Sequence, residues 1–125
     1  MKAYLIVFIG AGIGGMARHA VNLVAMKIGS SFPWHTFFVN VTGSLLMGLL
    51  IGWLTFKGNV SEAWRPFAVT GMLGGFTTFS TFSLDAALLF ERHSLTQAAV
   101  YVVGSVALSI LMLFAGLAVF RMTSA

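Results

Sequence analysis

The chain has 125 residues, of which 58% are hydrophobic and only 8% are charged, and its mean hydropathy is +0.96. Soluble domains carry about 25% charged residues, so this composition excludes an ordinary soluble domain and favours a membrane protein. The formal net charge is +4, but the seven Lys and Arg residues are scattered singly, which argues against a nucleic-acid-binding surface, and there is no cysteine for a disulfide or a thiolate metal site.

Turn-forming residues divide the chain into four apolar segments that are long enough to cross a bilayer as helices. Such a helix needs about 20 residues. The spans are predicted at 4–28, 33–56, 65–91 and 95–121, with turns at 29–33, 57–61 and 91–94. The first apolar run is longer than a signal-peptide core of ~7–15 residues, so we expect it to be retained. The predicted fold is an all-α membrane protein, with residues 1–125 forming one four-span domain.

The first span contains one arginine well inside its apolar run and a row of small residues. Arg18 has no acidic neighbour in the sequence, and we expect it either to snorkel to the interface or to form a positive vestibule that concentrates anions. Gly10 and Gly14 are four residues apart, as are Ala11 and Gly15, which places them on one face and favours close helix packing.

The second span carries a polar stripe. Thr36, Asn40 and Ser44 follow one another at four-residue steps through an otherwise apolar helix. The Asn40 carboxamide needs partners at this depth, and it can either donate to an anion or bond across to another helix. The sequence leaves both roles open. Gly48 and Gly52 continue the four-residue spacing after Ser44 and favour helix packing.

The third span contains the most informative segment. Residues 71–83 combine the Gly74-Gly75 pair with five Ser and Thr hydroxyls. Unpaired backbone groups are tolerated in a bilayer only where they are buried or line a cavity, so we predict a helix broken at the glycine pair that lines a polar path. The exposed carbonyls of such a break can hold an ion.

Phenylalanines recur every three residues in the same span. Phe76, Phe79 and Phe82 are predicted to lie along one side of a helix, with hydroxyls on the adjoining side. The positive edge of an aromatic ring favours a small anion without trapping it. The alternative is that these rings pack in the core or face lipid. Asp85, farther along, is expected to pair with Arg18 or Arg92 or to meet water at the interface.

The fourth span also carries a polar stripe. Tyr101, Ser105 and Ser109 are four residues apart and form a ladder of hydroxyls that can replace lost water in stages. The alternative is that each serine bonds to a carbonyl of its own helix.

The basic residues are almost evenly divided between the two ends of the predicted bundle. Four lie at the end with the N-terminus and three toward the other: Lys2, Lys57, Arg65 and Arg121, against Arg18, Lys27 and Arg92. A clear positive-inside bias would need more asymmetry. We therefore expect insertion in both orientations and pairing as an antiparallel homodimer, which supplies the inverted repeat that many transport proteins encode in one chain.

Residues 74–83 closely resemble the bacterial fluoride channels called Fluc or CrcB, and the resemblance extends over all four spans. The matching positions elsewhere are Gly12, Gly14, Gly15 and Arg18 in the first span and Asn40, Gly43 and Gly48 in the second. Two residues depart from the family pattern: His19 stands where an aromatic residue is common, and Asp85 where Glu is usual.

The resemblance implies an antiparallel dual-topology homodimer in the bacterial inner membrane, with two pores that pass fluoride passively out of the cell. It implies that Phe79 and Phe82 line the anion path with Asn40, and that Tyr101, Ser105 and Ser109 continue it. We also expect Thr36, from the polar stripe of the second span, on this path. It places Arg18 in the aqueous approach. It also implies a structural Na⁺ at the dimer centre, held by the backbone carbonyls of Gly74 and Thr77 from both subunits.

Two other classes of membrane protein are alternatives to a channel. A four-span proton-coupled multidrug exporter needs a buried acid in its first span, but the first acidic residue of this chain is Glu62. A pure helix-packing protein leaves the hydroxyl ladders unexplained. The sequence has no paired carboxylates and no nucleophile with a base, so it does not favour an enzyme.

Overall fold

The computed structural model describes residues 1–58 and 61–123, and its elements in these ranges are all helical. They are α1 (Lys2–Ile28), α2 (Trp34–Lys57), η1 (Pro66–Leu73), α3 (Gly74–Phe76), α4 (Phe79–Glu91) and α5 (Leu95–Thr123). The predicted four spans are confirmed, because α1, α2, the composite third span Pro66–Glu91 and α5 are each long and apolar enough to cross a membrane. The predicted turn at 57–61 includes residues 59–60, which lie outside the described ranges.

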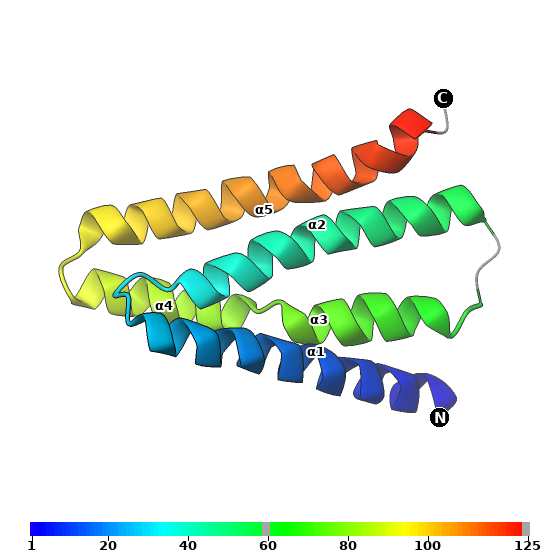
Figure 1. Cartoon of the computed structure of the whole chain (residues 1–125), viewed down its shortest axis with the longest axis horizontal. Coiled ribbons are helices and arrows are strands. Elements are labelled where there is room, and N and C mark those ends of the chain that lie inside the picture. Colours follow the sequence, from blue (N-terminus) through cyan, green and yellow to red (C-terminus); the bar gives the residue numbers. More distant parts are fainter. Residues whose placement is uncertain (59–60, 124–125) are drawn as a thin grey trace.

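The helices form two packed groups, and each group contains one part of the third span (Figure 1). α2 packs along α5, whereas α1 packs along η1 and α3. After the break the third span changes its neighbour, since α4 packs against α5 and, among the described residues, makes no contact with α1. The break is therefore the point at which the chain passes from one group to the other.

Glycines allow the closest helix contacts, as predicted for Gly10, Gly14, Gly48 and Gly52. A Cβ added at Gly14 would clash with the Met72 carbonyl oxygen and the Phe76 nitrogen, and one at Gly48 would clash with the Leu113 carbonyl oxygen. By contrast, a Cβ at Gly15 would meet nothing within 4 Å. Only part of the predicted small-residue face of α1 is thus in contact.

The third span is broken, but not at the glycine pair. Gly74 is helical, with φ −62° and ψ −38°, whereas Thr77 (φ −85°, ψ 159°) and Thr78 (φ −154°, ψ 124°) are extended. The glycines have a different role, because a Cβ at Gly75 would come within 2.5 Å of the Ala11 carbonyl oxygen. The predicted position of the break was therefore wrong by two to three residues.

This position corrects the prediction that Phe76, Phe79 and Phe82 share one helix side. Phe76 ends α3, while Phe79 begins α4, so the break separates the first ring from the other two. The segment before the break also differs from a simple α-helix, because η1 is a π-helix. The Phe67 and Met72 carbonyl oxygens of this wider helix lie against α1 at Gly10 and Gly14, where no side chain blocks them.

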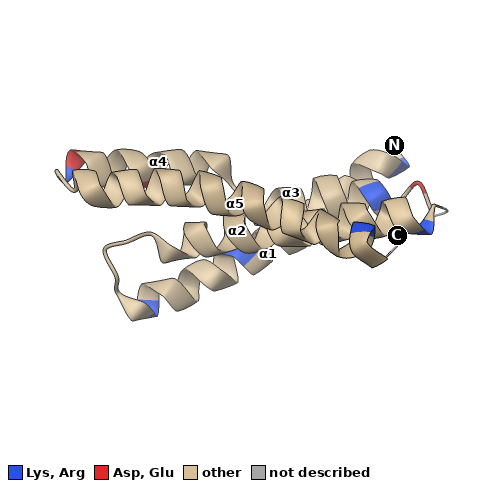
Figure 2. Ribbon diagram, turned by 90° about the horizontal axis from the view of Figure 1, so that it is seen from above, with Lys and Arg blue, Asp and Glu red and all other residues tan. Residues whose placement is uncertain are grey.

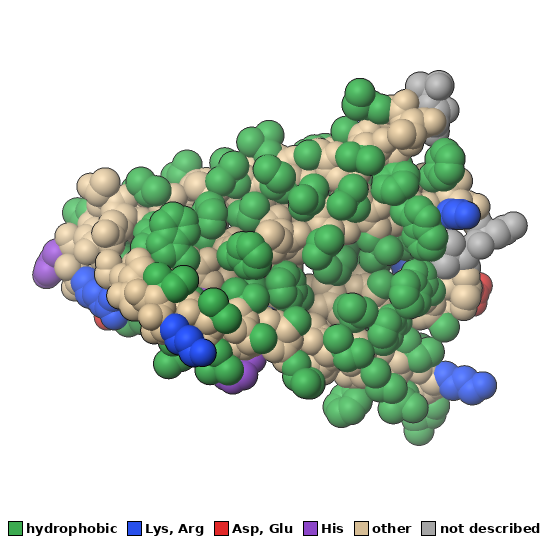
Figure 3. Space-filling view, viewed as in Figure 1, with side chains coloured by type: hydrophobic (Ala, Val, Ile, Leu, Met, Phe, Trp, Pro, Cys, Tyr) green, Lys and Arg blue, Asp and Glu red, His purple; other side chains and the backbone are tan. Residues whose placement is uncertain are grey.

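The outer surface suits a bilayer. Figure 3 shows hydrophobic side chains covering the middle of one face of the bundle, and Figure 2 shows charged residues gathered mainly toward the two ends. The buried core is small and lies near one end, where Phe82, Leu89 and Tyr101 pack together with Phe32 and Phe37.

Candidate functional site

The break is held by a two-way pairing between α2 and the third span. Asn40 Nδ2 donates to the Thr78 carbonyl oxygen at 2.9 Å, and the Thr78 N–H donates to Asn40 Oδ1 at 2.8 Å. The structure thus uses Asn40 to bond across helices. Because the amide nitrogen carries two N–H groups, one donor is left over after this pairing.

Two backbone carbonyls at the break lose their helical donors, one to Asn40 and one to the Thr78 hydroxyl. In a continuous helix the Thr78 N–H would donate to Gly74 O and the Thr81 N–H to Thr77 O. Here the first is taken by Asn40, and the second donates to Thr78 Oγ1 at 3.2 Å, which caps the start of α4. The Gly74 and Thr77 carbonyl oxygens, the two that the resemblance assigns to Na⁺, are therefore released from the helical ladder.

Arg18 reaches the break from α1. Its Nε donates to the Gly75 carbonyl oxygen at 3.1 Å, and the side chain is partly buried. In the part of the chain that the structure describes, no ion pair joins Asp85 to Arg18 or Arg92. Asp85 instead accepts a hydrogen bond from the Tyr101 hydroxyl at 3.2 Å.

A groove of about 430 Å³ lies beside the break, between α2, α4 and α5. It brings together most of the predicted path residues: Asn40, Phe79, Phe82, Ser105 and Ser109 all line it. The rings of Phe79 and Phe82 have centroids 5.5 Å apart, but their environments differ, since Phe79 is 76% exposed and Phe82 only 8%. The groove is thus enclosed around Phe82 and open around Phe79.

Two predicted path residues, Tyr101 and Thr36, do not line the groove and are 0% and 1% exposed. The Tyr101 ring lies 5.2 Å from that of Phe82. Thr36 Oγ1 and Ser105 Oγ are buried and have no hydrogen-bond partner among the described residues. The alternative that Ser105 bonds to its own helix is therefore wrong. Buried hydroxyls usually have hydrogen-bond partners, so a hydroxyl without one is free to donate a hydrogen bond to a bound ion.

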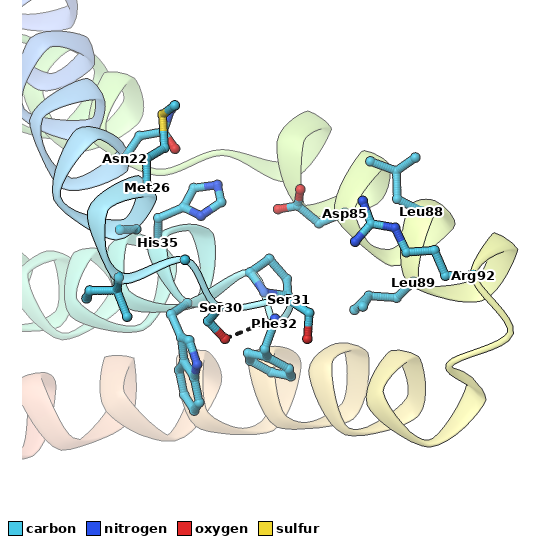
Figure 4. A pocket seen from close by; sticks show the side chains of 15 residues that line it. Asn22, Met26, Ser30, Ser31, Phe32, His35, Asp85, Leu88, Leu89 and Arg92 are labelled. Carbon is cyan, nitrogen blue, oxygen red and sulfur yellow. Dashed lines mark hydrogen bonds between the residues drawn. The ribbon is translucent and has the colours of Figure 1, made fainter.

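A second polar region lies toward the chain's 29–33 turn. A cavity of about 380 Å³ is lined by Asn22, His35, Asp85 and Arg92, whose side chains come from three helices (Figure 4). A neighbouring cavity of about 280 Å³ shares Asn22 and His35 and is also lined by Arg18. Arg18 therefore lines the second of two neighbouring cavities, and its role in a vestibule stays a prediction.

Asn22 and His35 were not predicted from the sequence as site residues. The signal for Asn22 was present, because it follows Arg18 by four residues and so lies on the same helical face. His35 adjoins Thr36 at the beginning of α2, and its position depends on the turn that brings α2 back beside α1.

The chain is similar to known proteins over nearly its whole length. The family model for "CrcB-like protein, Camphor Resistance (CrcB)" matches residues 5–117. The protein named fluoride-specific ion channel FluC from Rhodopseudomonas palustris (strain BisB5) is 59% identical over 94% of this chain and 96% of its own length. FluC 2 of Nitrobacter hamburgensis is 54% identical over the same shares, and FluC of Beijerinckia indica is 47% identical over 99% of this chain and 100% of its own length. The resemblance read from the sequence is confirmed, and the chain belongs to the CrcB/FluC family.

Proposed function

We propose that this chain forms a fluoride-selective ion channel that lets cytoplasmic fluoride leave the cell passively, down its electrochemical gradient. The name shared by its close relatives supplies the ion. The structural observation that supports it best is the buried Ser105 hydroxyl, which has no hydrogen-bond partner among the described residues and lines the groove together with Phe82. An ion channel of this kind needs no catalytic residues.

The groove meets the two requirements of conduction. An ion must exchange its hydration for protein groups, yet bind weakly enough to leave. Hydroxyls and the remaining Asn40 N–H replace water, while the edges of Phe79 and Phe82 supply a weak positive field. No Lys or Arg lines the groove among the described residues. A potential of 100 mV is worth about 2.3 kcal/mol per charge, which drives an anion outward when the interior is negative.

A dimer would complete this path. In the single chain Phe79 is 76% exposed and Gly74 is exposed too, so the groove and the break both lie open on the surface. Basic residues lie toward both ends of the bundle (Figure 2), which is compatible with insertion in either orientation. We therefore propose an antiparallel, dual-topology homodimer with one groove per subunit and two pores.

A single-cysteine label tests the orientation, because the chain has no cysteine of its own. Met122 is 79% exposed near the end of α5, so Met122→Cys should be accessible to a membrane-impermeant maleimide. Labelling of part of the protein from each side of sealed vesicles is expected. Labelling from one side only would overturn dual topology.

The released carbonyls of Gly74 and Thr77 fit the implied Na⁺. Unwound backbone in membrane proteins coordinates Na⁺ through such oxygens. No group of three or more His, Asp or Glu residues that could hold a metal occurs in ranges 1–58 and 61–123, so carbonyls are the natural ligands here. We propose that Gly74 and Thr77 of both subunits hold Na⁺ at the dimer centre, where it would stabilise the assembly.

Liposome efflux separates the channel from a proton-coupled exporter. Purified protein should release fluoride far faster than chloride, at rates that do not depend on an imposed proton gradient. Strong chloride release, or transport that requires the proton gradient, would contradict the proposal.

A further inference from the structure

We propose that Arg18 is a positioning residue whose hydrogen bond to the Gly75 carbonyl fixes the break in the third span, beyond any effect of its charge on anions in the vestibule. The inference rests on the proposed function only for its consequence for flux. The bond itself, Arg18 Nε to Gly75 O at 3.1 Å, joins residues 57 positions apart in the chain.

Arg18 replaces a helical donor. In an unbroken helix the Gly75 carbonyl would accept from the Phe79 N–H, because helical bonds join residues four apart. Phe79 instead begins α4 beyond the two extended threonines, and Gly75 accepts from Arg18. Asn40 makes the corresponding replacement at Thr78. Two side chains from two neighbouring helices thus satisfy the backbone on either side of the break.

The close approach of α1 explains why Arg18 reaches this carbonyl. Gly14 lies one helical turn before Arg18, and its Cα packs so closely on the third span that a Cβ there would clash with Met72 O. Ala11, a further turn back on the same side, packs against Gly75. Arg18 therefore lies at the end of the face of α1 that contacts the third span, beside α3.

The use of Nε divides the guanidinium between two tasks. Arginine carries five N–H donors, and the bond to Gly75 uses the one on Nε. The four terminal N–H groups remain for the cavity that Arg18 lines with His19, Asn22 and Thr78. Lysine keeps the charge but lacks this rigid, planar arrangement of donors. The structure thus predicts that charge alone does not replace Arg18.

The bond also separates the carbonyls of the break into two kinds. Gly75 O is already held by a cationic side chain, whereas Gly74 O and Thr77 O have lost their helical donors to Asn40 and Thr78. Arg18 thereby leaves Gly74 and Thr77, and not Gly75, for the proposed Na⁺. An unpaired carbonyl at membrane depth is unfavourable, so loss of Arg18 should let Gly75 seek another donor and shift the break.

The sequence offers a direct reporter of this bond. Gly75-Phe76 is the only Gly-Phe pair in the chain, so labelling with ¹³C-carbonyl glycine and ¹⁵N-phenylalanine gives one resonance for the Gly75 carbonyl. We expect its ¹³C shift to move in both Arg18→Lys and Arg18→Gln. It should stay in place in the matched control Lys27→Gln, which removes an exposed cation from the last turn of the same helix without touching the break.

Fluoride efflux is then measured at 1 M salt. The screening length is about 3 Å there, so most of the effect of the Arg18 charge on anions in solution is removed. Under these conditions Arg18→Lys should conduct roughly tenfold more slowly than the native chain, as expected when a charge-assisted bond to a carbonyl is lost. Lys27→Gln should match the native rate. Native flux in Arg18→Lys together with an unmoved Gly75 shift would overturn the inference.

Failure of the Arg18 variants to fold and failure of the proposed function give different results. If both Arg18 variants fail to fold, the native protein labelled with ¹⁵N-arginine and ¹³C-carbonyl glycine still tests the bond, because a dipolar coupling from Arg18 Nε to Gly75 is expected and its absence would overturn the inference. If the native protein conducts no fluoride, the proposed function fails, while the Gly75 shift continues to test the bond.

Discussion

The two halves of the third span are built on opposite principles. Before the break, η1 and α3 lie against α1 through glycines, so backbone meets backbone. After the break, α4 lies against α5 through large side chains, with the Phe82 and Tyr101 rings in contact and a polar groove alongside. The first half anchors the third span on α1, and the second half lines the groove that we propose as the anion path.

This difference predicts two kinds of variant. Changes at the break and in the glycine contacts should act on the fold first and on flux only as a consequence. Changes to the groove residues of α4 and α5 should act mainly on flux, because this side of the groove contains a hydroxyl, that of Ser105, that the folded chain does not use.

The largest effect is expected at the junction of the two halves. Asn40→Ala leaves the Thr78 N–H without its acceptor, which costs about 1–3 kcal/mol, and removes one donor to the Thr78 carbonyl, which contributes about 0.5–1.5 kcal/mol. We expect a loss of roughly 1.5–4.5 kcal/mol in the free energy of unfolding, measured by denaturation in detergent, and loss of flux. Gln97→Ala, which removes an exposed amide near the start of α5, serves as the control. Equal stability of the two variants would show that Asn40 does not hold the break.

The groove half is tested by Phe82→Ile. The substitution keeps an apolar side chain but removes the ring edge, an effect of about 0.5–1.5 kcal/mol. We expect fluoride efflux to fall about tenfold while dimers still assemble. The control is Phe90→Ile on the same helix, where the ring is 64% exposed and outside the groove. Unchanged flux in a folded Phe82→Ile protein would remove Phe82 from the path.

The glycine half is tested by Gly14→Ala. Its new methyl group would clash with the backbone of η1 and α3, and overpacking of this kind costs about 1–3 kcal/mol. We expect a lower thermal midpoint, followed by scanning fluorimetry. Gly15→Ala is the matched control, because its methyl group would enter open space. Similar midpoints for the two variants would argue against backbone contact between α1 and the third span.

The smallest effect, and the most discriminating, is expected for Ser105→Ala. The Ser105 hydroxyl is buried without a partner among the described residues, so its removal should leave stability unchanged or slightly raised. If an ion uses this donor, efflux should fall by a few fold, in keeping with one hydrogen bond of about 1 kcal/mol. Ser83→Ala, which removes an exposed hydroxyl bonded to Phe79 O, should change neither quantity. Native flux in Ser105→Ala would exclude this serine from the path.

The spans and much of the candidate site could be predicted because they depend on local patterns. Hydropathy and turn residues gave the helix boundaries, and four-residue spacing gathered Asn40, Ser105 and Ser109 on faces that do meet in one groove. The position of the break could not be predicted in this way. It depends on a side chain from another helix, Asn40, which competes for the backbone of Thr78 across 38 residues of sequence.

The partners of the charged residues were similarly beyond local patterns. Asp85 was expected to meet Arg18, Arg92 or water, but Tyr101 donates to it across helices. Arg18 was expected at the interface or in a vestibule, and its bond to Gly75 could be seen only once the close packing of α1 on α3 was known.

The most direct test of passive fluoride conduction is a fluoride-electrode recording from liposomes that contain the purified protein, with a potassium gradient and valinomycin to set the membrane potential. We predict rapid fluoride release that begins with the ionophore and follows the size of the imposed potential. Release no faster than from protein-free liposomes would contradict it.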